Sequence, residues 1–271
     1  MGWGNDAVLD LAFRIPHDRP PRGLLVLTAY VDETGQEQGD WMFIAGYMGS
    51  DDAWRSFPEP WQKAISPRKH LHMNRLKFKS PADRKMLALA ANVPTQCGLI
   101  PLIAGLRQND YRELLTGTKQ ERTLSGYVLG CMAVAAIALS SLPPGERLEI
   151  VMERQDRYGW LADVALQVIF DYKGDKSLLL ADGTPKLANW RFVSKDQTVL
   201  TEAADYLAYA YLQVSRDSKS IRSQWCAPIL DAQGPHTQLC LLLPTQVREM
   251  INQWKVVHLI EEAKRKIHKE N

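Results

Sequence analysis

The sequence predicts one α/β domain spanning residues 1–271. Strand-like apolar runs alternate with helical segments, a hairpin opens the series, and no linker or internal repeat divides the chain. With 45% hydrophobic and 24% charged residues, the composition is that of an ordinary globular protein. The net charge of +2 gives no global basic field, so any site for a polyanion has to be a local patch.

The first elements form a predicted hairpin behind an N-terminal arm. Residues 1–23 are mixed in character and end in DRPPRG, which is typical of an arm laid on a domain. Residues 24–34 are rich in Val, Leu and Tyr and end in acids, and residues 41–49 form a second apolar run. The polar turn GQEQGD joins the two runs, so we expect paired strands.

Two helices and an extended piece follow the hairpin. Ser50 is a predicted N-cap for a helix whose apolar residues recur every three to four positions. These residues are Trp54, Phe57, Trp61 and Ile65. Residues 70–73 are expected to be extended, and Ser80-Pro81 begins a helix that runs to about Ala91.

The middle of the chain contains an uncharged helix. A strand is predicted at 97–106, a short helix capped by Asn109-Asp110 follows, and a long helix covers about 120–141. Residues 124–142 carry no charge over nearly the length of a membrane span. Because Ala, Gly and Ser dominate this stretch and prolines end it, we expect a helix buried in protein and no contact with membrane.

The last part of the chain continues the alternation. A strand is predicted at 147–153 and a helix at 159–171. Two strand-like runs, 176–181 and 189–195, flank a turn at Asp182-Gly183, and a helix covers 198–214. Residues 215–271 are then expected to form a loop-rich excursion, 215–243, and an amphipathic C-terminal helix.

Several common chemistries are excluded by missing motifs. The sequence has no GxxxxGK[ST], GxGxxG, HExxH or GxSxG, which argues against nucleotide-fuelled, dinucleotide-linked, zinc-peptidase and serine-hydrolase activities. The four cysteines show no metal-ligand spacing, and we expect reduced thiols in a cytoplasmic protein. They are Cys97, Cys131, Cys226 and Cys240.

Acids stand at the ends of apolar elements. Asp32 and Glu33 end the first strand, and alternation places only Asp32 on the face of Thr28 and Tyr30. Glu33 is therefore expected to be an ordinary turn residue. His70 and His72 alternate on one side of their segment, either as ligands or as surface and packing residues.

Three further acids lie on later elements. Glu153 ends another apolar strand, and Glu202 and Asp205 share one face of an otherwise apolar helix. Buried carboxylates are costly and repel one another, so their coincidence indicates a hard divalent cation, Mg²⁺ or Mn²⁺. The alternative is that each acid is a turn, capping or solvated residue.

Four segments, in this order, resemble the domain-of-unknown-function 3800 family, a branch of the ribonuclease H-like superfamily. They are AYVDETG, FIAGYMG with the Trp54–Trp61 helix, LHMNRLKF and TEAADYLAYAY. Members of that family open with a Tyr-x-Asp-Glu-Ser-Gly strand and close with a Gln-x-Ala-Asp-Leu helix. The resemblance covers about residues 24–214, the predicted core.

The resemblance implies a ribonuclease H-like mixed sheet, opened by a β-hairpin and flanked by helices, with an added C-terminal helix. Asp32 then matches the first-strand catalytic acid and Asp205 the acid of the late helix, while Glu153 stands where an Asp is usual. Glu202 stands where many members carry Gln, and His72 matches a recurrent His. The implied reaction is two-metal hydrolysis of phosphodiester bonds in DNA or RNA, in a context such as defence or a mobile element.

In that reaction Asp32, Glu153 and Asp205 would be the metal ligands, and Glu202 a further ligand or an acid behind them. His72 would transfer a proton or touch a phosphate. Cations at 154, 157 and 195 are candidates for phosphate contacts. Two alternatives stay open: a catalytically degenerate module that binds nucleic acid or a partner protein, and a homo-oligomer assembled through the 124–142 helix.

Overall fold

A computed structural model describes residues 26–35, 39–116, 125–153, 159–194, 198–234, 237–253, 258, 260–262 and 265. The predicted arm at 1–23 and the candidate phosphate-binding cations Arg154, Arg157 and Lys195 lie outside these residues. So do the start of the predicted helix at 120–141 and much of the predicted C-terminal helix.

The strands form one six-stranded mixed sheet in the order β5-β4-β1-β2-β3-β6. Their bounds are β1 Val26–Thr34, β2 Trp41–Gly49, β3 Ile100–Arg107, β4 Arg147–Glu153, β5 Leu187–Val193 and β6 Gln238–Leu242. Both β1–β2 and β2–β3 are antiparallel, whereas β4 pairs with β1, β5 with β4 and β6 with β3 in parallel. The predicted α/β class and opening hairpin are confirmed.

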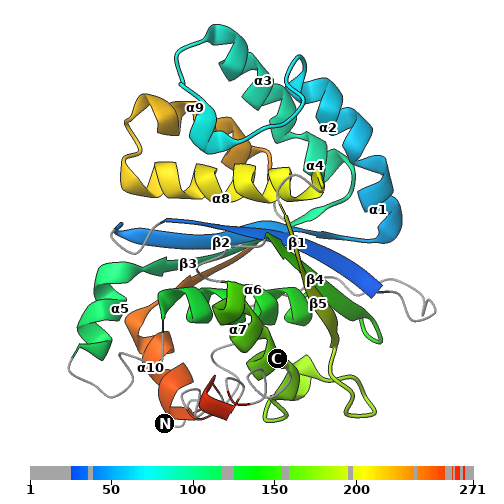
Figure 1. Cartoon of the computed structure of the whole chain (residues 1–271), viewed down its shortest axis with the longest axis vertical. Helices are drawn as coiled ribbons and strands as arrows, with labels where there is room; N and C mark the ends of the chain where they lie inside the picture. The colour runs from blue at the N-terminus through cyan, green and yellow to red at the C-terminus, as the bar shows by residue number, and fades with distance from the viewer. Residues whose placement is uncertain are drawn as a thin grey trace.

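Helices cover both faces of this sheet (Figure 1). One face carries α8 (Leu200–Arg216), which packs on β1 and β2. Around and above α8 lie α1 Asp51–Ser56, α2 Pro58–Ile65, the short η1 Met73–Arg75, α3 Pro81–Ala91, α4 Val93–Gln96 and α9 Ile221–Asp231. The opposite face carries α5 Gln108–Leu115, α6 Gly126–Ser140, α7 Gly159–Asp171 and α10 Pro244–Gln253, and η3 Lys176–Leu178 precedes β5. Each face therefore has its own hydrophobic core.

Local capping chemistry sets several of the helix ends. Ser50 and Ser80 cap α1 and α3 as predicted, each accepting a hydrogen bond from a backbone N–H of the first turn. The helix expected from Trp54 to Ile65 is instead two helices. Pro58 has no N–H to continue the α1 ladder, and it fits the first turn of α2.

Three local predictions are wrong. The runs at 176–181 and 189–195 are not paired with each other in the described residues: Leu179 forms an isolated bridge with Pro185, and β5 pairs with β4. The segment 215–243, expected to be rich in loops, contains α9 and β6. Asn109 and Asp110 lie inside α5, which begins one residue earlier, after Arg107.

The uncharged helix α6 is buried in protein, as predicted. Residues 127–139 are all buried, because α6 packs against β2 and β3 on one side and against α7 on another. Its Gly130 lets the helix approach Ile44 and Met42 of the sheet closely. No helix in the described part of the chain has the length and apolar character needed to cross a membrane.

We expect Gly46→Ala to destabilise the protein. A Cβ atom at Gly46 would lie 1.9 Å from the Tyr30 carbonyl oxygen and 2.7 Å from the Val31 Cα, and backbone atoms of a paired strand cannot move aside. The free energy of unfolding should fall by about 1–3 kcal/mol. Gly159→Ala is the control, since no described atom lies within 4 Å of its added Cβ. Equal denaturant midpoints for the two variants would contradict the expectation.

Candidate active site

Asp32 and Glu153 lie side by side where β1 and β4 end. Val31 pairs with Met152 in the parallel register, so the next residues along the two strands are these two acids. Tyr30, two residues before Asp32, belongs to the core under α8, so alternation places Asp32 on that face. Both acids are buried. Two buried acids thus occupy neighbouring positions near the ends of β1 and β4, between the sheet and its upper helices.

Glu33 faces the other way. Its charge acts on Cys131, whose thiol pKa is raised by burial and further by Glu33, and Cys131 belongs to α6 under the opposite face. The pKa of Tyr127 in α6 is raised by burial first, then by Cys131 and Glu33, and to a smaller extent by Asp32. Val31, two residues before Glu33, belongs to the core that contains α6, so alternation places Glu33 on that face and Asp32 on the face of α8.

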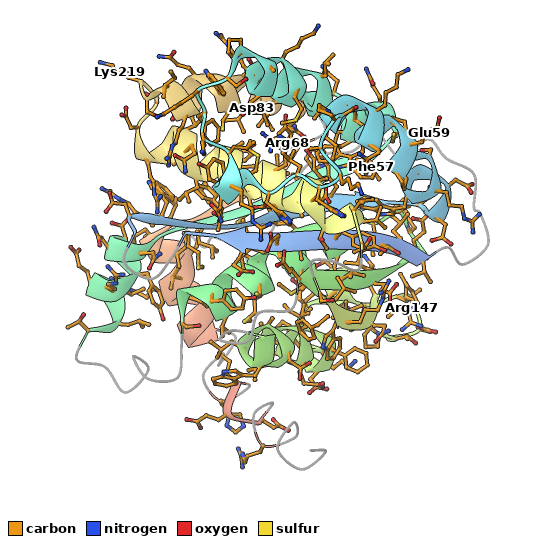
Figure 2. The ribbon with its side chains drawn as sticks, turned by 45° about the horizontal axis from the view of Figure 1, so that its top comes forward. Phe57, Glu59, Arg68, Asp83, Arg147 and Lys219 are labelled. Atoms are coloured by element: carbon orange, nitrogen blue, oxygen red, sulfur yellow. The ribbon has the colours of Figure 1, made fainter. Side chains whose placement is uncertain are left out.

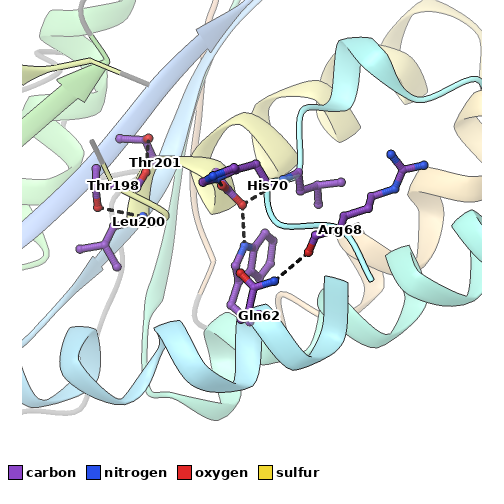
Figure 3. A network of polar contacts seen from close by, with 9 residues as sticks. Gln62, Arg68, His70, Thr198, Leu200 and Thr201 are labelled. Carbon is purple, nitrogen blue, oxygen red and sulfur yellow. Dashed lines mark hydrogen bonds and ion pairs between the residues drawn. The ribbon is translucent and has the colours of Figure 1, made fainter. Parts of the chain in front are cut away.

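Glu202 on α8 is the centre of a hydrogen-bond network. The Trp61 indole N–H donates to Glu202 Oε2 at 3.0 Å, and the Leu71 backbone N–H donates to the same oxygen at 3.1 Å. His70 Nδ1 lies 2.8 Å from Oε1 and donates its proton, because a carboxylate only accepts. The Glu202 side chain is 1% exposed, and Figure 3 shows the network around His70. Both carboxylate oxygens are engaged by donors from the segment before α3 and from α2.

Asp205, one turn later on α8, holds the same segment. Its Oδ2 accepts the Met73 backbone N–H at 3.2 Å, and the carboxylate is buried. We call residues 70–73 the strap, because Glu202 and Asp205 tie it across α8 at two points. Glu202 and Asp205 therefore hold the strap against α8.

The start of the strap is fixed by its neighbours. Arg68 pairs with Asp83 of α3 at 2.7 Å, and both lie in the helical layer above α8 (Figure 2). The Arg68 carbonyl accepts a hydrogen bond from Gln62 Nε2 at 2.7 Å (Figure 3). The strap is therefore attached to α2, α3 and α8.

His72 lies in the strap between the two tie points. Its ring stacks on that of His70, with centroids 6.4 Å apart and planes inclined by 25°. The two histidines thus project to one side, as their alternation in sequence predicts. His70 reaches solvent, whereas His72 is half-buried.

The donor types suit a hard divalent cation. Asp32, Glu153 and Asp205 offer carboxylate oxygens, the ligands that Mg²⁺ and Mn²⁺ prefer, and they come from three elements around one face. Within the described ranges, no three His, Cys, Asp or Glu side chains are gathered closely enough to enclose an ion. Asp32 and Glu153 occupy neighbouring positions on β1 and β4. Glu202 and one carboxylate oxygen of Asp205 instead accept hydrogen bonds from the strap.

Sequence reasoning missed the partners of Glu202. It placed Trp61 on an apolar helix face, where the indole ring is indeed buried. A buried indole N–H needs an acceptor, and this was the available signal for a polar group beneath that face. The Leu71 N–H is a backbone donor and leaves no such signal.

Comparison of the chain with protein-family models, curated proteins and solved structures found no match.

Proposed function

We propose that this protein hydrolyses phosphodiester bonds in nucleic acid with the help of Mg²⁺ or Mn²⁺. The observation that carries the proposal is the placement of Asp32, Glu153 and Asp205. These buried acids come from a first strand, a middle strand and a late helix, and all belong to the α8 side of the sheet. A mixed sheet that opens with a hairpin and has helices on both faces supports the ribonuclease H-like resemblance.

Electrostatics supports a cation at this place. Two adjacent carboxylates at a strand end repel each other, and burial removes the water that would screen them. A bound divalent ion would offset both charges. Arginine and lysine side chains could do the same, but the acids would then be structural and their neutralisation would not affect any response to metal.

Each residue has its own part in the proposed reaction. Asp32, Glu153 and Asp205 would hold the metal, which when bound would stabilise charge on the phosphate and lower the pKa of a water molecule. Glu202 fixes the strap through its contacts with His70 and Leu71. The strap carries His72 next to Met73, whose N–H binds Asp205, and the His72 imidazole would donate a proton to the leaving oxygen.

A second candidate is a related module that binds nucleic acid or a partner protein without cutting. It is favoured by the engagement of both Glu202 oxygens and of Asp205 Oδ2 by protein donors, which leaves fewer carboxylate oxygens for an ion. A nuclease assay with Mg²⁺ or Mn²⁺, repeated with a chelator, separates the two candidates.

Thermal melts of Asp205→Asn with and without Mn²⁺ test the metal site directly. At a hundredfold excess over Kd, Mn²⁺ should stabilise the wild-type protein by about 2.7 kcal/mol. The variant should lose most of that gain, while its metal-free form melts at or slightly above the wild-type temperature because one repelling charge is gone. The amide oxygen can still accept the Met73 N–H.

Asp52→Asn is the control for these melts. Asp52 is a fully solvated acid at the start of α1, so its neutralisation should leave the Mn²⁺ response intact. A full Mn²⁺ response in Asp205→Asn would show that Asp205 is not a ligand.

A further inference from the structure

Positive charge is concentrated in the stretch of chain around the strap. Residues 62–85 contain eight Lys and Arg residues and a single acid, Asp83, whereas the whole chain has a net charge of only +2. Asp83 already pairs with Arg68 at 2.7 Å, so the other seven cations have no acidic partner in this stretch. A nearly neutral chain can bind a polyanion through a local patch of this kind.

The segment 70–79 is attached to α8 along its length. Glu202 and Asp205 accept backbone N–H groups of the strap, which is the first part of this segment. Farther along, the Phe78 ring stacks on Tyr209 of α8, with centroids 5.7 Å apart and planes inclined by 7°. The segment lies in the helical layer above α8 (Figure 1). Its exposed side chains are therefore carried on a backbone that is fixed at both ends.

Buried and exposed residues alternate along this segment. Its apolar side chains pack inward, and they are Leu71, Met73, Leu76 and Phe78. The exposed cations on and beside the segment are Lys69, Arg75, Lys77 and Lys79. Within the described residues, none of these four side chains forms an ion pair or a hydrogen bond. Their charges are therefore available to a ligand in solution.

Helix α9 adds a fifth cation at the end of the segment. The Arg222 guanidinium lies 5.6 Å from the ring centroid of Phe78, the residue between Lys77 and Lys79. Arg222 also contacts the Tyr209 hydroxyl, and no carboxylate in the described part of the chain pairs with it. We call these five exposed cations the basic ridge: Lys69, Arg75, Lys77, Lys79 and Arg222.

The basic ridge offers charge without an exposed apolar or aromatic group. Segments that bind a membrane surface insert apolar side chains into it, whereas those of segment 70–79 are buried. The aromatic residue of the segment, Phe78, is 2% exposed, so no base can stack on its ring. Contacts to the phosphates of nucleic acid need only cations, and they carry no sequence information.

We infer that the basic ridge binds the phosphate backbone of nucleic acid and does not read its sequence. The ridge begins next to the strap, so a bound strand that follows it passes His72. That this nucleic acid is also cut at Asp32 and Glu153 rests on the proposed function, whereas binding needs neither metal nor cleavage. A duplex has more phosphates per unit length than a single strand, so it should bind at least as tightly.

Binding of the full chain to a fluorescent 20-base-pair DNA duplex in EDTA tests this inference, because metal-dependent cleavage cannot occur there. The double variant Lys77→Ala with Lys79→Ala should raise the Kd by about tenfold at physiological salt. The slope of log affinity against log salt concentration should become shallower by about 2, since each phosphate contact contributes about 1. A second duplex of unrelated sequence should give a Kd within about twofold of the first.

Lys173→Ala with Lys176→Ala is the matched control. It also removes two exposed lysines, and they lie after α7 and in η3, on the side of the sheet away from α8. Because both double variants lose the same net charge, a difference between them reports where the charge lies. The control should keep its Kd within about twofold of the wild-type value and should keep the salt slope. Thermal melts first show that both variants fold.

Equal Kd values and salt slopes for the two double variants would overturn the inference. So would the absence of binding by the wild-type protein at low salt, or tighter binding to phosphatidylserine vesicles than to the duplex. If the Lys77→Ala, Lys79→Ala protein loses binding and no metal supports cleavage by the wild-type protein, the ridge stands and the proposed hydrolysis fails. If the protein cuts but that variant binds normally, the hydrolysis stands and the ridge fails.

Discussion

Asp32→Asn should abolish cleavage of nucleic acid in Mg²⁺ or Mn²⁺ while the protein still folds. The amide preserves the shape of the side chain, and its oxygen can still accept the Glu33 N–H that Asp32 Oδ1 accepts at 2.8 Å. What is lost is a negative charge that faces Glu153 on the α8 side of the sheet. Loss of a direct ligand should cost more than the roughly 10–100-fold in metal affinity or activity that loss of a supporting hydrogen bond costs.

Glu33→Gln is the matched control, because Glu33 is the next residue and its charge acts toward α6. Its initial rate of cleavage should stay close to that of the wild-type protein. Rates are measured at saturating Mn²⁺, after thermal melts have shown that both variants fold. Comparable rates for Asp32→Asn and Glu33→Gln would remove Asp32 from the proposed metal site.

Glu202→Ala should cause the largest loss of stability. It deprives the Trp61 N–H and the Leu71 N–H of their acceptor inside the protein, and it removes the partner of His70. Removing one partner of a buried charged network costs about 3–5 kcal/mol. At roughly 2–4 °C per kcal/mol for a chain of this size, the melting temperature should fall by at least about 6 °C.

Two further variants serve as comparisons for the melting temperature of Glu202→Ala. Glu59→Ala removes an exposed acid from α2 and should melt within about 1–2 °C of the wild-type protein. Glu202→Gln keeps an accepting oxygen and should lie between the wild-type protein and Glu202→Ala. A Glu202→Ala protein as stable as Glu59→Ala would mean that the network contributes nothing to the fold.

Some of the helices and strands could be predicted from the sequence, whereas the pairing of others could not. The bounds of β2, β4 and α7 follow from local hydrophobic patterns, and Ser50 and Ser80 follow from capping chemistry. The pairing of β5 was missed because the Asp182-Gly183 turn suggests a local hairpin, whereas the partner of β5 is β4. Such a partner is chosen by packing across the sheet, which no short window of sequence contains.

In the candidate site, too, some features could be predicted from the sequence and others could not. Alternation along β1 correctly separates Asp32 from Glu33, because the faces of a strand follow from its sequence alone. The engagement of Glu202 by Trp61 and the strap could not be predicted, since it depends on how α2 and α8 pack. The sequence analysis did not predict α9 within 215–243, and this helix contains Pro228, a residue type that usually indicates the end of a helix.

The order of strands in the sheet has a consequence for how the chain folds as it is made. On one side β1 pairs with β2, which follows it immediately, so this hairpin can form early. On its other side β1 must wait for β4, which is synthesised only after α6. Until then that edge of β1 exposes unpaired backbone groups and is open to association with other chains. Asp32 and Glu153 become neighbours only when β4 docks against β1. The chain must therefore have emerged from the ribosome at least as far as Glu153 before these two acids can lie together.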